Sequence, residues 1–411
     1  MINTEELFNV LLLAAIALIF ARVLGYLFHR IKQPAVIGEI FAGVILGAIV
    51  ILFFTGQRLT ILNAPITIPN LNFHSPEFTL LAEIGILFLL FISGLETSFS
   101  RLKKTGKSSV FVAIGGVTVP FILGFVFSFL FGFSITDSIV VGLVLTATSV
   151  GVTVRTLMDL HVIDTDASTT ILGAAVIDDI IGILLLAFAI GIGSLMDAVW
   201  IGARIVFFFL IFLYLGLKVI DKILDLGERL HLPKALLSIS LSVFLIYAFF
   251  ADKAGISGII GAFVAGILIG QNVRSKKIAD DVKALGYGFF IPLFFVWIGS
   301  SLWLEASSDF SVYIPVLIFA AVVIFVSIIG KIIGCGLGAK LSWMSRRESL
   351  QIGVGMVPRM ELALIIATAA IGHNILSDEF SHQILIVTIL LTIITTLLAP
   401  VLIKATFKNA K

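Results

Sequence analysis

The chain has 411 residues, of which 59% are hydrophobic and only 13% are charged, and its formal net charge at pH 7 is +2. Soluble domains carry about 25% charged residues, so this composition, with a mean hydropathy of +1.18, indicates a protein whose main solvent is lipid. The small net charge argues against a nucleic-acid partner, and the single cysteine, Cys335, excludes a disulfide within the chain.

Apolar stretches long enough to cross a bilayer, which takes about 20 residues, recur along the whole chain. The first follows the acidic start MINTEELF, so we interpret it as a retained helix and not as a cleaved signal peptide. We expect an all-α integral membrane protein, a single membrane domain over 1–411 surrounded by lipid, without a nucleotide-binding or regulatory domain. Its thirteen expected transmembrane helices are 6–28, 35–54, 78–97, 108–131, 134–158, 168–193, 198–218, 235–251, 256–271, 283–304, 312–340, 348–372 and 380–404.

The basic residues predict an orientation for these helices. Of the 27 Lys and Arg residues, 20 lie at or after the ends of odd-numbered segments, whereas the connections after even-numbered segments contain only Arg58 and Lys253. The positive-inside rule then places the N-terminus outside and the C-terminus in the cytoplasm, in a multi-pass protein of the cell membrane.

Two of the segments share a pattern of small residues. Segment 35–54 contains IGEIFAGVILG and segment 256–271 contains IGAFVAGILIG, with glycine or alanine at four matching positions. Because the offset is seven segments, an odd number, the two copies would cross the membrane in opposite directions, as in the inverted repeats of secondary transporters. We predict a first repeat over 6–193, a linking helix over 198–218 and a second repeat over 235–404. Chance recurrence of small residues in apolar helices is the alternative.

The same offset relates segments 134–158 and 348–372, and both contain residues that weaken a helix. The first contains LTATSVGVT, with Thr148, Ser149 and Thr153, and the second contains GVGMVPRMEL, with Pro358. Glycine and proline leave backbone groups unpaired, and such groups survive at membrane depth only inside protein or beside water. We therefore predict two broken helices that cross near the bilayer midplane. Two ordinary kinked helices are the alternative.

Two adjacent carboxylates, Asp178 and Asp179, lie near the middle of segment 168–193. Each costs roughly 2.5–3.5 kcal/mol on insertion scales, so an intramembrane carboxylate is by default a functional-site hypothesis. Adjacent residues on a helix point about 100° apart. One aspartate can therefore face a neighbouring helix while the other faces water.

Few cations lie at a comparable depth. Lys331 is embedded in the run IIGKIIGCGLG and could pair with one of the aspartates, or it could extend to the membrane surface instead. Arg359 lies beside Glu361 in the second broken segment, and these two could form a structural pair that holds the broken helix together. Glu83, in segment 78–97, is interpreted as a structural or vestibule charge with a smaller chance of a role in transport.

Buried carboxylates suit the exchange of cations for protons. A small hard cation requires oxygen ligands, and a carboxylate also binds a proton, so one site can hold either but not both. Thr148 and Ser149, together with carbonyl groups of the broken segment, could supply the remaining oxygens, and Thr153 is a further candidate. The sequence contains no nucleophile motif, phosphate loop or metal cluster, so we expect a transporter without a cofactor and not an enzyme.

These motifs resemble those of bacterial and archaeal sodium/proton antiporters of the cation:proton antiporter superfamily, over essentially the whole chain. The matches are TATSVGVT at 146–153, VIDD at 176–179, the lysine in its GK context, and GMVPRMELALII at 355–366, where Met360 replaces the family's usual glycine. The paired aspartates resemble the electrogenic branch. The resemblance implies Na⁺ and proton binding at Asp179, an Asp178–Lys331 pair, an elevator motion, and homodimers.

Several alternatives stay open at this point. The transported cation could be sodium, lithium or potassium, because selectivity depends on cavity geometry that the sequence does not give. A sodium-coupled symporter of an organic anion would have a larger substrate cavity and would move no protons. A channel or a non-transporting sensor would show no coupling between ions.

Overall fold

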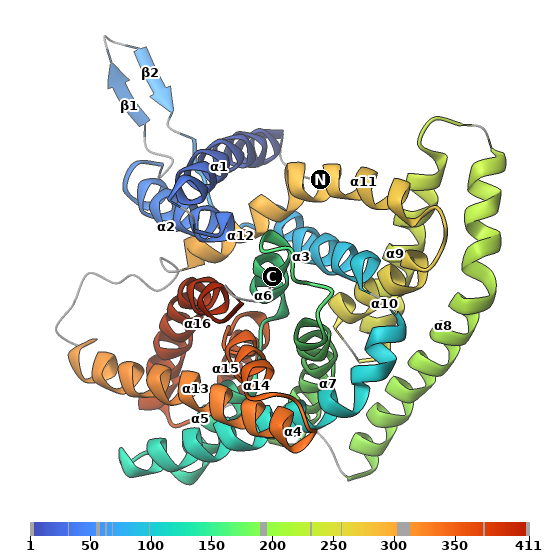
Figure 1. Cartoon of the computed structure of the whole chain (residues 1–411). Helices are drawn as coiled ribbons and strands as arrows, with labels where there is room; N and C mark the ends of the chain where they lie inside the picture. Colours follow the sequence, from blue (N-terminus) through green and yellow to red (C-terminus); the bar gives the residue numbers. More distant parts are fainter. Residues whose placement is uncertain are drawn as a thin grey trace. The chain divides into compact units, whose positions relative to one another are not determined.

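The computed structural model describes the chain except for residues 1–3, 32, 55–57, 62–63, 68, 98, 190–194, 231, 256, 302–312, 373–374 and 408–411. The described residues are helical apart from one short hairpin (Figure 1). The chain divides into two compact units, one formed by Met1–Phe88 with Lys283–Ser308 and the other by Leu89–Val282 with Asp309–Lys411.

The first unit is built around the packing of α2 on α1 and α12. Glycines make this close approach possible, because a Cβ on Gly43 would overlap the carbonyl of Val296 on α12. In the same unit, Arg22 donates a hydrogen bond to the carbonyl of Tyr287 in a π-helical turn. The elements are α1 (Thr4–Arg30), α2 (Ala35–Phe53), β1 (Arg58–Ile61), β2 (Ala64–Thr67), the first part of α3 (Pro76–Glu96), η1 (Gly286–Phe290) and α12 (Ile291–Ser300).

The second unit contains the remaining helices, among which α4 contacts α5, α7 and α13. Its elements are the end of α3, α4 (Phe99–Leu130), α5 (Ile135–Thr146), α6 (Val150–Asp159), α7 (Asp166–Ala189), α8 (Leu195–Arg229), α9 (Ala235–Lys253), α10 (Gly258–Gly270), α11 (Ser275–Leu285, which ends in the first unit), α13 (Tyr313–Leu341), α14 (Arg346–Gly355), α15 (Glu361–Gly372) and α16 (Asp378–Phe407). Its apolar core joins α5, α13, α15 and α16 through side chains such as Val141, Phe319, Ala367 and Ile384.

The membrane-spanning segments expected from the sequence coincide with helices of the structure. In the described residues, nine helices are long and apolar enough to cross a membrane, and Gly258–Gly270 and Leu362–Ile371 are shorter apolar helices. Three expected segments are shorter than the helices observed: α4 already begins at Phe99, α8 extends from Leu195 to Arg229, and the helical run over the described part of 283–304 begins at Ser275. These extensions are richer in charged residues than the apolar stretches, so hydropathy alone does not detect them. The count of thirteen crossings stays a prediction.

The two copies of the glycine motif make equivalent contacts, each within its own unit. On α2, a Cβ at Gly38 would overlap the backbone of α1, and Gly43 packs against Gly299 of α12. On α10, Gly261 packs in the same way against α9, and Gly266 packs against Gly94 of α3. In both copies, therefore, one glycine meets the preceding helix, and the glycine five residues later meets a glycine of a helix distant in the sequence, α12 for the first copy and α3 for the second.

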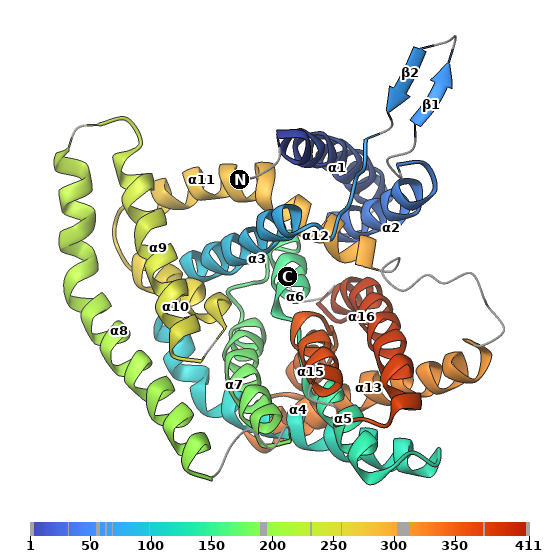
Figure 2. The same ribbon diagram turned by 180° about the vertical axis from the view of Figure 1, so that it is seen from behind.

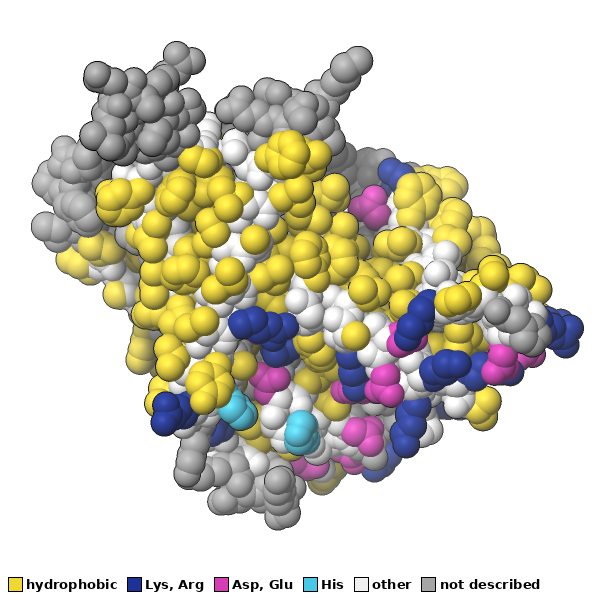
Figure 3. Space-filling view, turned by 90° about the horizontal axis from the view of Figure 1, so that it is seen from above, with side chains coloured by type: hydrophobic (Ala, Val, Ile, Leu, Met, Phe, Trp, Pro, Cys, Tyr) yellow, Lys and Arg dark blue, Asp and Glu magenta, His cyan; other side chains and the backbone are white. Residues whose placement is uncertain are grey.

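Large hydrophobic side chains cover much of the outer surface. On α8, for example, Phe207 and Leu210 are exposed, as is Phe325 on α13. Figure 3 shows hydrophobic side chains in broad continuous areas of the visible face, with most charged side chains gathered apart from them. Apolar areas of this extent are unusual in a monomeric soluble protein and are expected where lipid is the solvent.

Candidate functional site

Two helices of the second unit are interrupted, and the interruptions are bonded to each other. The first lies between Thr146, where α5 ends, and Val150, where α6 begins, and the second lies between Gly355 and Glu361. The Ser149 N–H donates to the Pro358 carbonyl at 2.8 Å, and Thr153 Oγ1 donates to the Gly355 carbonyl at 2.6 Å. These segments are therefore true breaks that meet, and not ordinary kinks.

Arg359 stabilises the second interruption from within. Its side chain is fully buried, and Nη1 donates to the carbonyl groups of Met356 and Val357, each at 3.2 Å. These carbonyls follow the end of α14, where a helix carries partial negative charge. The Arg359 N–H donates to Thr395 Oγ1 of α16 at 3.1 Å, so the arginine is held at both its backbone and its side chain. The side chain of Glu361 lies outside the described residues, and with it the expected Arg359–Glu361 pair.

The structure brings Lys331 and Asp178 together. Lys331 Nζ of α13 lies 3.2 Å from Asp178 Oδ2 and 3.3 Å from Oδ1 of α7, and both side chains are 0% exposed. Lys331 therefore does not extend to the membrane surface. A buried charge is tolerated when an opposite charge and hydrogen bonds compensate for its lost hydration, and here the pair supplies both.

Helix α4 provides the close packing that encloses this pair. A Cβ on Gly115 would overlap the backbone of Gly334 on α13, so the two helices touch through their main chains. A Cβ on the neighbouring Gly116 would lie 2.5 Å from Cys335 Sγ and 3.3 Å from Lys331 Nζ. α4 and α13 lie side by side in both ribbon views (Figure 1 and Figure 2). Gly116 is not among the site residues predicted from the sequence, although the adjacent glycines in the run AIGGVT were an available signal.

Asp179 has a different environment from Asp178. It is only partly buried and lines a cavity of about 10 Å³, roughly the size that admits one water molecule. The two carboxylates thus point in different directions, as their adjacency on a helix requires. The other seven lining residues are all apolar and come from α3, α6, α7 and α10: Leu90, Val150, Leu172, Val176, Ile259, Ile260 and Phe263.

The remaining predicted site residues differ in how they are bonded. Ser149 Oγ donates to Met360 Sδ at 3.1 Å, and Thr153 is bonded across the two interruptions as described. Thr148 is buried, and its hydroxyl has no hydrogen-bond partner among the residues that the structure describes. Glu83 has an exposed side chain and belongs to the first unit, so the structure does not group it with the aspartates.

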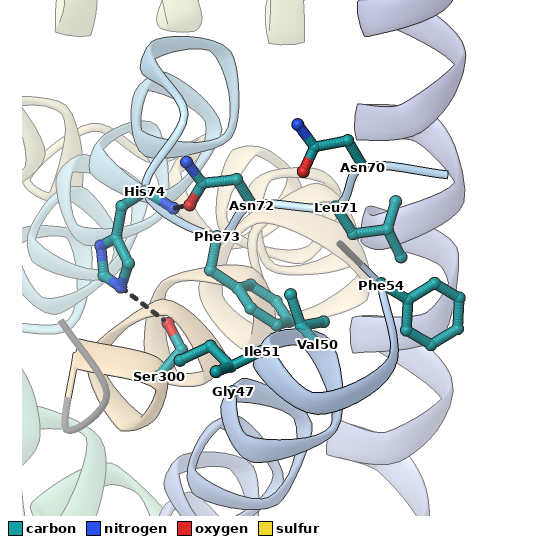
Figure 4. Close-up of a pocket in the computed structure, with 10 residues that line it drawn as sticks. All are labelled: Gly47, Val50, Ile51, Phe54, Asn70, Leu71, Asn72, Phe73, His74 and Ser300. Carbon is teal, nitrogen blue, oxygen red and sulfur yellow. Dashed lines mark hydrogen bonds between the residues drawn. The ribbon is translucent and has the colours of Figure 1, made fainter. Parts of the chain in front are cut away.

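A larger pocket of about 470 Å³ lies in the first unit and contains none of the predicted site residues. Figure 4 shows the His74 ring directed toward the Ser300 hydroxyl, with 3.4 Å between Nε2 and Oγ. Burial lowers the pKa of His74 below its usual value, and a hydrogen bond with the Ser300 backbone opposes this shift. The described residues that line this pocket include no charged side chain, so they do not supply the carboxylates of a cation site.

Comparisons of sequence and structure relate the chain to known proteins. Residues 14–404 match the family described as "Sodium/hydrogen exchanger, transmembrane". The chain is 37% identical to the probable Na⁺/H⁺ antiporter GerT of Bacillus cereus, covering 89% of this chain and 91% of that protein. It is 34% identical to the Na⁺/H⁺-K⁺ antiporter GerN of the same organism, covering 96% and 95%.

Two further similarities extend to another organism and to a solved structure. The chain is 33% identical to a Na⁺/H⁺ antiporter of Enterococcus hirae, with 94% of this chain and 96% of that protein covered. Its fold is similar to that of the sodium proton antiporter MjNhaP1 from Methanocaldococcus jannaschii, with a TM-score of 0.63, 19% identity and 98% of both chains covered. The extent of these matches, together with the paired aspartates between two interrupted helices, shows that the chain belongs to the sodium/hydrogen exchanger family.

Proposed function

We propose that the chain exchanges sodium for protons across the cell membrane by alternating access and that the exchange is electrogenic. The observation that carries this proposal is the pair of adjacent aspartates in two environments, one in a buried ion pair with Lys331 and the other on a water-sized cavity. Membership of the family makes the chain a multi-pass membrane transporter that needs no cofactor and catalyses no enzymatic reaction.

In this proposal Asp179 carries either the cation or a proton. A sodium ion needs several oxygen ligands. Thr148 and Ser149, in the first interruption, carry the hydroxyl oxygens nearest in sequence to Val150, which lines the Asp179 cavity. Protonated Asp179 is neutral and cannot hold the cation, so the two ions compete. The apolar lining keeps bulk water away, which prevents both ions from crossing without exchange.

The Asp178–Lys331 pair is the second element of the proposed ion coupling. Asp179 is adjacent to Asp178 in the chain, so a cation bound at Asp179 brings a positive charge close to the pair and acts on its charges. Release of a proton from this region for each cation bound, in addition to the proton of Asp179, makes the exchange move net charge. This is the feature that distinguishes electrogenic from electroneutral exchange.

The proposed mechanism also includes the inverted repeat and the homodimer expected from the sequence. The equivalent contacts of the α2 and α10 glycines support an inverted repeat over 6–193 and 235–404, linked by the helix that includes 198–218. In such a transporter one part of the protein moves across the membrane relative to another part. The part that stays fixed forms the contact between the two subunits of a homodimer. The N-terminus is placed outside and the C-terminus in the cytoplasm.

Potassium/proton exchange is the second candidate, because the relative GerN is named a Na⁺/H⁺-K⁺ antiporter. The cation affects only the final ligand distances and leaves the rest of the mechanism unchanged. An organic anion, in contrast, does not fit a cavity of about 10 Å³ at Asp179.

Reconstituted proteoliposomes test the proposal directly. An imposed sodium gradient is expected to change the internal pH, and the change is expected to respond to a clamped membrane potential. Asp179→Ala is expected to abolish the flux, because the shared carboxylate is removed. Repeating the measurement with lithium and potassium identifies the cation. Full flux in Asp179→Ala would contradict the site, and absence of sodium-driven proton movement in the wild type would contradict the function.

A further inference from the structure

The residues immediately before α6 and α15 contact each other through their side chains. Ser149 is the N-cap of α6, yet its hydroxyl accepts no hydrogen bond from that helix and instead donates to Met360 Sδ at 3.1 Å. Met360 occupies the same position on α15, because its carbonyl accepts from the N–H groups of Ala363 and Leu364. Both side chains are 2% exposed, so water does not reach this contact.

Neither side chain caps the helix that it precedes. Serine is a preferred N-cap because its oxygen accepts a hydrogen bond from a backbone N–H of the first turn, and Ser149 makes no such bond. Methionine has no group that can cap a helix in this way. Departures from local preference concentrate at functional sites, so this contact calls for a reason other than helix stability.

The chemistry of a hydroxyl supplies such a reason. A serine hydroxyl has one hydrogen to donate and two lone pairs to accept with. To ligate a cation it must direct a lone pair at the ion and its hydrogen elsewhere. The Met360 thioether is a weak acceptor that takes this hydrogen, which leaves the lone pairs of Ser149 Oγ available.

The position of Ser149 connects this contact to the ion site. The next residue, Val150, lines the cavity that Asp179 also lines. Sulfur is a soft ligand and a poor partner for a small hard cation, so Met360 itself is not expected to bind the ion. Any influence of Met360 on the ion therefore passes through the hydroxyl that it holds.

We propose that Met360 is a positioning residue for cation binding, because its thioether fixes the hydrogen of the Ser149 hydroxyl and so presents the oxygen to the transported ion. This inference rests on the proposed sodium/proton exchange. It assigns a role to the residue at which this chain departs from the glycine usual in the family it resembles.

Met360→Leu tests the proposal in proteoliposomes, because it conserves volume and removes only the acceptor. Loss of one oriented hydrogen bond is expected to raise the apparent KM for sodium by about three- to tenfold. The kcat is expected to stay within about twofold, since Asp179 and the ion pair are intact. Met360→Gln keeps an acceptor at similar reach and is expected to return the KM toward the wild-type value.

Two controls separate positioning from general packing. Met344→Leu removes a hydroxyl–sulfur contact of the same kind, from Thr170 Oγ1 at 3.9 Å, outside the site, and is expected to leave the KM unchanged. In a double-mutant cycle, Met360→Leu is expected to have no further effect on the KM once Ser149→Ala is present.

The outcomes distinguish this inference from the function on which it rests. A wild-type KM in Met360→Leu, or an undiminished effect of Met360→Leu in the Ser149→Ala background, overturns the inference while exchange through Asp179 stands. If the wild type moves no protons under a sodium gradient, the proposed function fails and this inference fails with it. Should Met360→Leu accumulate poorly, Met360→Ala and Met360→Gln carry the same comparison.

Discussion

Asp178 and Asp179 are neighbours in sequence and differ in almost every other respect. Asp178 faces α13 and is fully enclosed with Lys331, whereas Asp179 faces a small cavity between other helices. The turn of about 100° between adjacent helical residues is sufficient to separate them. One short motif therefore places one carboxylate in a buried ion pair and the next one on a small cavity.

Lys331→Gln is expected to destabilise the protein strongly, because it leaves the Asp178 carboxylate buried without a partner. Removal of one member of a buried pair costs about 3–5 kcal/mol. Thermal unfolding of the purified protein in detergent measures this loss. The double variant Asp178→Asn with Lys331→Gln is the control and should recover much of the stability, since no unpaired charge remains.

The same variant tests the coupling role of the pair. Lys331→Gln is expected to lose the response of exchange to a clamped membrane potential, even where some sodium-driven flux remains. Voltage-dependent exchange with a normal pH profile in Lys331→Gln would show that the pair is not the second element of the coupling.

At the scale of helices, the sequence predicted the breaks but not what the breaks contact. Glycine, proline and a run of hydroxyl residues identified 146–153 and 355–361 as weak helix, because these residues act locally. The Ser149–Met360 contact joins residues 211 apart, and nothing in either segment alone indicates it. The contact of Gly116 with Lys331 also depends on how α4 and α13 pack.

Gly116→Ala is expected to impair exchange, because the added Cβ would lie 2.5 Å from Cys335 Sγ and 3.3 Å from Lys331 Nζ. The lysine ammonium must then move by a few tenths of an ångström, which changes its contact with Asp178, so the pH profile of sodium-driven exchange should move and not merely decrease in amplitude. Gly106→Ala on the same helix is the matched control, since a Cβ there meets nothing within 4 Å. An unaltered pH profile in Gly116→Ala would contradict this role of α4.

At the scale of the whole molecule, hydropathy predicted an all-helical membrane protein and the positions of most helices. It did not indicate the hairpin formed by β1 and β2, which lies in a connection between helices. The pairing of these two strands involves only a few residues. Nor did it indicate the extension of α8 to Arg229, because the last turns of that helix carry charged residues. Hydrophobicity detects the part of a helix that contacts lipid, and its ends are determined by other interactions.

The predicted orientation can be measured with membrane-impermeant thiol reagents in intact cells. Lys253→Cys lies in an expected external connection and should be labelled directly, whereas Trp343→Cys lies in an expected cytoplasmic one and should be labelled only after permeabilisation. Both side chains are highly exposed, and the native Cys335 is buried, so it should contribute little background. The reverse labelling pattern would show that the orientation is opposite to the predicted one.

The bonds between the two interruptions also bear on how the protein is made. Thr153 and its acceptor, the carbonyl of Gly355, are 202 residues apart, so the first broken helix is synthesised long before its partner exists. At bacterial-type rates of roughly 5–20 residues per second, the interval is on the order of 10 to 40 seconds. During that time the unwound backbone at 147–149 lacks its final partners, and the nascent chain must keep this segment near water or the insertion machinery. A ribosome that stalls in the second half of the message would therefore leave a membrane intermediate with an exposed polar segment, a natural target for quality-control proteases.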